Sequence, residues 1–111
     1  MMPSGKEEKN FRFKNRKGII FLDEIPLKIS FESISLFFGK FGSINKSFFL
    51  SITDYQEIRK RKIIGLIEYT NKIKAKKTAY FFKKLRTKFF GLHVKYLRNM
   101  HWENLKIKYS F

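Results

Sequence analysis

The sequence predicts an α+β fold, a ferredoxin-like β-α-β-β-α-β sandwich with a C-terminal extension. Short apolar runs of β-forming residues and longer segments of helical periodicity follow one another in that order along the chain. At 111 residues, the chain has enough apolar residues for one modest core and too few for a second. We therefore expect one two-layer domain at residues 17–96, an arm at residues 1–16 and the extension at residues 97–111.

The first strand and the first helix follow a polar, aperiodic arm that we expect to be flexible and basic. From Lys17 onward, the run "GIIFLDEIP" is short, rich in β-formers and stopped by Pro26, which favours a strand. Ser30 can cap the helix that follows. This helix has apolar residues at i, i+3, i+4 and i+7, which form one face: Ile34, Phe37, Phe38 and Phe41.

The second half of the domain is predicted to contain three strands and one helix. A strand at residues 43–51 follows the turn "GKFGSI", a polar loop occupies residues 52–62, and the apolar run "IIGLIEY" forms the third strand. Asn71 or Thr70 caps a helix with one apolar face, made by Ala75, Ala79, Phe82 and Leu85. A last strand between residues 88 and 96 completes the sheet. Both helices cover one face, and the other face is expected to be exposed.

The charge balance indicates a polyanionic partner. Twenty-five Lys and Arg against nine Asp and Glu give a formal net charge of +16, a self-repulsion that a polyanion neutralises. Nucleic acid is the leading partner, and an anionic membrane surface is the second. The chain has no apolar run of about 18 residues, and its first residues lack the apolar core of a signal peptide. We therefore expect a soluble intracellular protein with no membrane partner.

Enzyme chemistry is not indicated by the titratable residues. His93 and His101 are the only histidines, and neither has the spacing to carboxylates of a metal site. The chain has no cysteine and no Ser-His-Asp order, and "GKFG" lacks the Gly-Lys-Ser/Thr ending of a phosphate loop. We expect no catalytic site, no metal, no cofactor and no small-molecule substrate.

An exposed sheet face on a basic domain is typical of the RNA recognition motif, in which aromatic side chains of the two central strands stack on bases. On the first strand, Phe21 lies between Ile20 and Leu22, and alternation sends Phe21 to the open face. On the third strand, Ile64 and Leu66 replace the two aromatic residues of the motif.

The missing aromatic residues weaken the case for base readout by this face. Stacking on an aromatic ring contributes about 1 to 3 kcal/mol per base, so we expect no sequence-specific readout of several bases. Ile64 and Leu66 either contact RNA or are covered by a protein or by the C-terminal extension. Phe21 is then the one stacking platform.

Phosphate contacts are predicted from a basic run in the loop before the third strand, made of Arg59, Lys60, Arg61 and Lys62. The alternatives for this run are a solvated loop or a nuclear localisation patch. The lysines of the second helix are interpreted as a solvated face that widens the basic field: Lys72, Lys74, Lys76 and Lys77.

Four stretches of the chain resemble one protein family: "KGIIFLDEIP" at 17–26, "FGKFGSI" at 38–44, "GLIEYTNKIKAKKTA" at 65–79 and "KYLRNMHWENL" at 95–105. On these stretches the chain resembles the eukaryotic activator of basal transcription and its yeast counterpart, the eighteen-S rRNA factor, which are nucleolar proteins with an atypical RNA recognition motif. The last stretch is the most specific. Relatives have Trp in place of Leu66 and longer basic flanks, so the chain resembles a reduced version of the family.

The resemblance implies a role in early small-subunit ribosome assembly in the nucleolus and nucleus. The implied partners are pre-rRNA or small nucleolar RNA, proteins of the small-subunit processome and an RNA helicase. The leading hypothesis is an RNA-binding factor for 18S pre-rRNA processing. The residues expected to dock the extension or a protein partner are Lys95, Tyr96, Trp102 and Leu105.

Two other functions stay open at this point. One is a protein-interaction module with a lapsed RNA face, in which Ile64 and Leu66 contact a processome protein or a helicase. The other is a pre-mRNA splicing factor or nuclear RNA chaperone of the same fold, which differs from the leading hypothesis in its partners only.

Overall fold

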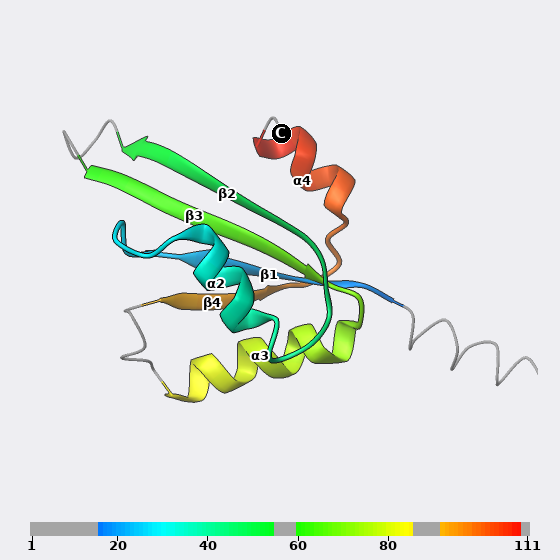
Figure 1. The fold of residues 1–111 in the computed structure, drawn as a ribbon. Helices are drawn as coiled ribbons and strands as arrows, with labels where there is room; N and C mark the ends of the chain where they lie inside the picture. The colour runs from blue at the N-terminus through cyan, green and yellow to red at the C-terminus, as the bar shows by residue number, and fades with distance from the viewer. Residues whose placement is uncertain (1–15, 55–59, 86–91, 110–111) are drawn as a thin grey trace, which may run out of the picture.

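The computed structural model describes residues 16–54, 60–85 and 92–109. In this part of the chain, four antiparallel strands form one sheet in the order β2-β3-β1-β4. Three helices accompany the sheet (Figure 1). The elements are β1 (Gly18–Asp23), α2 (Phe31–Phe38), β2 (Ile44–Asp54), β3 (Lys60–Tyr69), α3 (Lys72–Leu85), β4 (His93–Leu97) and α4 (Trp102–Tyr109). The predicted ferredoxin-like fold is confirmed, whereas residues 1–15 of the predicted arm (residues 1–16) lie outside the described residues.

The main core lies between the sheet and the two helices α2 and α3 (Figure 1). Alternation along β1 places Ile20 and Leu22 in this core, as the sequence predicts. The rings of Phe38 in α2 and Phe82 in α3, with centroids 5.2 Å apart, join the two helices. Other buried core residues come from all parts of this layer, among them Ile34, Ile67, Tyr69, Ala75 and Ala79.

Helix α2 forms because its cap and its apolar spacing agree. Ser30 has extended backbone, and its Oγ accepts a hydrogen bond from the N–H of Ser33 at 3.1 Å, which satisfies one of the free amides of the first turn. Ile34 and Phe38 are buried one turn apart. The helix therefore lies with its predicted apolar face on the sheet.

Helix α3 approaches β1 closely at its first turn. The Oδ1 atom of Asn71 accepts a hydrogen bond from the N–H of Ile73 at 2.8 Å, so Asn71 caps the helix as predicted. A Cβ atom on Gly18 would lie 2.8 Å from both the Cβ of Ala75 and the Cα of Lys72. Only glycine fits at this contact, and it brings the start of α3 beside the start of β1.

The β2–β3 hairpin is longer than the sequence predicts. The prediction of a polar loop at residues 52–62 is wrong at both ends. Residues 52–54 continue β2, and residues 60–62 begin β3. Cα pairing continues from Leu50 with Ile64 out to Asp54 with Lys60. The ladder satisfies backbone groups whatever the side chains are, so a charged sequence does not exclude strand structure here.

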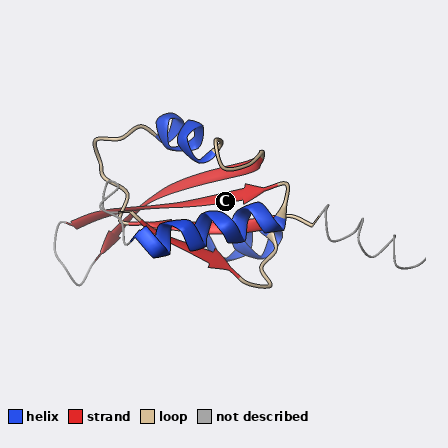
Figure 2. Ribbon diagram, turned by 90° about the horizontal axis from the view of Figure 1, so that it is seen from below, coloured by secondary structure: helices blue, strands red, loops and turns tan. Residues whose placement is uncertain are grey.

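Helix α4 lies on the face of the sheet opposite to α2 and α3. In Figure 1, α4 lies above the strands and α3 below them, and in the view from below α3 lies in front of the strands (Figure 2). The face that was expected to be exposed is therefore partly covered by the C-terminal extension.

We predict that Tyr69→Phe lowers the free energy of unfolding by about 1 kcal/mol at neutral pH, because the buried Tyr69 hydroxyl donates a hydrogen bond to the carbonyl oxygen of Phe38 at 2.7 Å. Burial raises the pKa of Tyr69 from 10.0 to about 12. The unfolded chain therefore ionises first, and the wild type loses stability as the pH rises from 10 towards 12.

Urea denaturation of both proteins across this pH range measures the effect. The wild-type stability should fall faster than that of Tyr69→Phe, so the difference between the two proteins should shrink with rising pH. A difference that does not change with pH would contradict this assignment.

Candidate nucleic-acid interface

Helix α4 packs its two apolar anchors on the central strands of the sheet. Trp102 and Leu105 of α4 form a buried cluster with Ile19 of β1 and Leu66 of β3. We call these four residues the α4 cluster. Five partly buried side chains pack around it: Phe21, Phe48, Leu97, Met100 and Tyr109. The cluster is a second, smaller core on the face where a recognition surface was expected.

The tertiary contact is what stabilises α4. A helix of eight residues is too short to persist alone in water. The chain turns back towards the sheet at Asn99, whose left-handed backbone (φ 55°) is a conformation that asparagine adopts more readily than most residues. Full burial of an apolar side chain stabilises by about 1.5 to 3 kcal/mol, and α4 buries two of them. The docked position is therefore the stable one.

The predicted base-contact positions lie under or beside α4. Leu66 is fully buried in the α4 cluster, and Ile64 is 3% exposed. Phe21 projects to this face, as alternation predicts, but it is half-buried against the cluster. The sequence left open whether Ile64 and Leu66 contact RNA or are covered by a protein or by the C-terminal extension. For Leu66, the structure shows cover by the C-terminal extension. A base cannot stack over Leu66 while α4 is docked.

The predicted phosphate-binding run lies mainly within a strand. Arg59 lies outside the described residues, and Lys60 and Arg61 belong to β3. The Nζ of Lys62 forms an ion pair with the Oδ1 of Asp23 at 3.1 Å. A half-exposed pair of this kind contributes at most about 1 kcal/mol. Binding of a phosphate by Lys62 competes with this pair.

The expected docking residues of the extension divide between the two faces. Trp102 and Leu105 lie in the α4 cluster, and Lys95 is exposed opposite Phe21. Tyr96 lies elsewhere, because alternation in β4 turns it to the helix side. There it packs against the main core, with the Nζ of Lys76 5.7 Å from its ring centroid.

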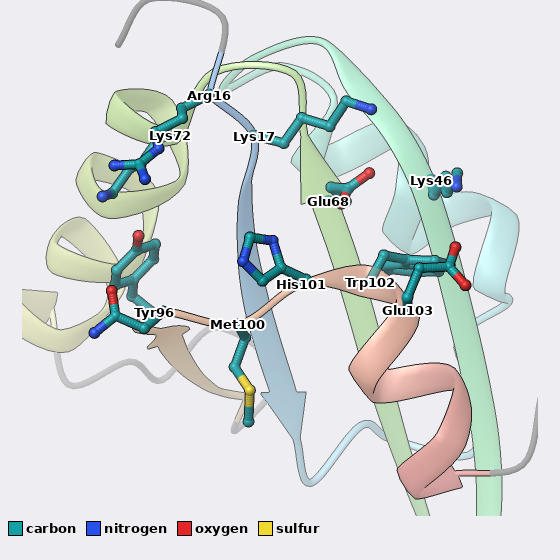
Figure 3. Close-up of a pocket in the computed structure, with 11 residues that line it drawn as sticks. Arg16, Lys17, Lys46, Glu68, Lys72, Tyr96, Met100, His101, Trp102 and Glu103 are labelled. Carbon is teal, nitrogen blue, oxygen red and sulfur yellow. The ribbon is translucent and has the colours of Figure 1, made fainter. Parts of the chain in front are cut away.

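A basic pocket of about 460 Å³ lies between the start of β1, the first turn of α3 and the connection from β4 to α4 (Figure 3). Its cationic lining comes from separate elements of the chain: Arg16, Lys17, Lys46 and Lys72. We call this site the basic pocket. Sequence reasoning missed it because no short run contains these residues, and only Lys72 was noticed, as part of a solvated helix face.

The electrostatics of the basic pocket are dominated by positive charge. Burial lowers the pKa of Lys72, and three neighbouring cations lower it further: Lys76, Arg16 and Arg98. Glu68 is 5% exposed, and its Oε1 accepts a hydrogen bond from the Nδ2 of Asn45 at 2.7 Å. The pocket thus combines four cations with two carboxylates, Glu68 and Glu103, of which Glu68 is held by Asn45.

Comparison with solved structures gives the nature of the fold. The chain is similar to the C-terminal RRM domain of MEC-8 bound to AGCACA, with 15% identity and a TM-score of 0.54 over 77% of this chain and 95% of that one. It is similar to RRM3 of Pes4, with 16% identity and a TM-score of 0.57 over 75% of this chain and 94% of that one. The fold is that of an RNA recognition motif. No protein-family model and no curated protein matches the chain.

A third similar structure is the Sxl-lethal protein/RNA complex, with 18% identity and a TM-score of 0.52 over 86% of this chain and 52% of that one. At these identities the likeness is one of fold. The recognition motif therefore fixes the arrangement of strands and helices, and the chemistry of the site has to be argued from this chain's own residues.

The described part of the chain contains neither a membrane-spanning helix nor a group of metal ligands. None of its helices there is long and apolar enough to cross a membrane. Within the same residues, His, Asp and Glu side chains form no group of three that could hold a metal ion. The α4 cluster and the basic pocket remain the features that bear on binding.

We predict that Leu105→Asp releases α4 and shifts the fluorescence emission of Trp102, the only tryptophan of the chain, to longer wavelength. Trp102 is 9% exposed while α4 is docked, and burying an unpaired carboxylate in the α4 cluster costs several kcal/mol. Far-UV circular dichroism checks that the sheet remains folded.

The matched control is Ile107→Asp on the same helix, because Ile107 is 81% exposed. Its emission should equal that of the wild type. Unchanged emission in Leu105→Asp, with the sheet intact, would show that α4 does not depend on this contact.

Proposed function

We propose that the protein is a non-catalytic RNA-binding assembly factor for 18S pre-rRNA processing in small-subunit ribosome biogenesis. The observation that supports RNA binding best is a recognition-motif fold on a chain with a formal net charge of +16. Ribosome biogenesis and a nucleolar location rest on the family resemblance of residues 95–105, which form the end of β4, the turn and the start of α4.

RNA binding by this protein depends on phosphate contacts more than on base stacking. With α4 docked, Leu66 is buried, and the rings of Phe21 and Phe48 on this face are only partly accessible. Each neutralised phosphate of a single strand contributes about −0.7 to the slope of log Kobs against log salt. The predicted contacts from Arg59, Lys60, Arg61 and Lys62 act through this same term.

The protein-interaction alternative is less well supported by the geometry. It uses Ile64 and Leu66 as the partner surface, yet both are buried. A protein that contacts Leu66 has to displace α4 and replace the packing of Trp102 and Leu105. RNA that binds at the basic rim leaves this packing intact.

We predict RNA binding that weakens steeply with salt. Fluorescence anisotropy with a labelled single-stranded oligouridylate at increasing NaCl should give a log-log slope of about −2 or steeper, as expected from three or more phosphate contacts. Binding that is micromolar or weaker and does not change with salt would contradict RNA binding by phosphate contacts.

The place of the protein in the cell is tested by affinity purification of the tagged full chain. Sequencing of the bound RNA should recover pre-rRNA or small nucleolar RNA, and mass spectrometry should recover processome proteins and an RNA helicase. Recovery of pre-mRNA and splicing proteins instead would favour the splicing-factor alternative and contradict the ribosomal role.

A further inference from the structure

The basic pocket lies at the end of the sheet away from the predicted Arg59–Lys62 run. Lys46 pairs with Glu68 near the end of β3, whereas Lys60 begins this strand at the hairpin tip. Eight residues of strand separate Lys60 from Glu68, which corresponds to about 27 Å. The two regions therefore cannot bind the same phosphate.

Two lysines of the basic pocket, Lys17 and Lys72, are available for a ligand. Among the described residues, no carboxylate lies within ion-pair distance of Lys17 or Lys72. The Nζ of Lys46 lies 6.0 Å from the centroid of the Trp102 ring, so it extends over the start of α4. Like charges gathered in one hollow raise the free energy of the unbound state, and a bound anion relieves this repulsion.

The carboxylate of Glu68 adds a hydrogen-bond acceptor to this basic surface. Its Oε1 is held by Asn45, and the described residues offer no partner to Oε2. No fully buried side-chain oxygen of the described residues lacks a partner, so Oε2 is not fully buried. Because Glu68 lines the basic pocket, its carboxylate borders the space that a ligand would occupy.

We propose that the basic pocket binds a single strand of RNA, with Lys17, Lys46 and Lys72 on phosphate oxygens and Glu68 Oε2 accepting a hydrogen bond from a ribose 2′-hydroxyl. Phosphate and hydroxyl are the two polar groups that recur along an RNA strand, and they match the cations and the Glu68 carboxylate of this site. This inference rests on the proposed RNA-binding function and gives it a location.

The site also gives α4 a direct part in binding. Met100 and His101 of the β4–α4 connection and Trp102 at the start of α4 line the pocket (Figure 3). The pocket therefore exists only while the α4 cluster holds the helix on the sheet. In this arrangement α4 covers the face on which bases would stack and helps to form a phosphate site beside it.

The test compares two triple variants of the full chain that remove equal charge. The pocket variant removes three cations from the basic pocket by Lys17→Gln, Lys46→Gln and Lys72→Gln. The control changes three exposed lysines that do not line it: Lys28→Gln, Lys40→Gln and Lys83→Gln. Anisotropy with a labelled oligouridylate is measured across a salt series, and Trp102 emission checks that α4 stays docked.

Each phosphate contact with a single strand contributes about −0.7 to the slope of log Kobs against log salt. Loss of three contacts should therefore make the slope of the pocket variant shallower by about 2. Its affinity at 0.1 M salt should fall about a hundredfold. The control should lose much less of both. Equal losses in the two variants would overturn the pocket as the site and leave RNA binding by the general field of the domain. Absence of salt-dependent binding in the wild type would overturn both the site and the proposed function.

The role of Glu68 is tested separately by Glu68→Gln, which keeps an acceptor for Asn45. The wild type should prefer an oligouridylate to the matching oligodeoxyuridylate, and the variant should lose several-fold of this preference while binding both strands at least as tightly. An unchanged preference in Glu68→Gln would overturn the 2′-hydroxyl contact.

Discussion

The packing of Trp102 and Leu105 on Ile19 and Leu66 determines how both faces of this sheet are used. Without it, an eight-residue helix does not persist, and two apolar side chains of the central strands are exposed to water. With it, the sheet has a core on each side. The same contact fixes the path of the chain from β4 to α4, and so it builds one wall of the basic pocket.

The apolar residues of β3 fit this arrangement better than aromatic platforms would. Leu66 is fully buried against α4, so a flat ring there would have to be accommodated beside Trp102 at a cost in packing. An aliphatic side chain fills the space under the helix and offers nothing to a base. Part of the positive charge of the domain lies at the rim instead, where Lys17, Lys46 and Lys72 come from three separate parts of the chain. RNA bound at the rim is therefore held by contacts to its phosphate backbone, and its bases are not read.

The fold could be predicted because local signals agreed with one another. Ser30 and Phe38 marked the cap and the buried face of α2, and alternation placed Phe21 correctly on β1. Alternation also predicts that Tyr96 lies on the side of the sheet that the helices cover, once the start of β4 is known. The sequence does not mark that start. The positions that failed depend on contacts between distant residues. The extension of the hairpin is held by cross-strand pairing, and the basic pocket unites residues up to 87 positions apart, from Arg16 to Glu103.

The RNA affinity of Leu105→Asp relative to the wild type tests most directly whether α4 is part of the binding site or a cover over the sheet. Removing α4 dismantles the wall of the basic pocket and uncovers Phe21 and Leu66. If RNA is held in the pocket, a folded Leu105→Asp protein with a released α4 binds the oligouridylate more weakly and with a shallower salt slope. Tighter binding by this variant would show that the open sheet face is the RNA site and that α4 blocks it.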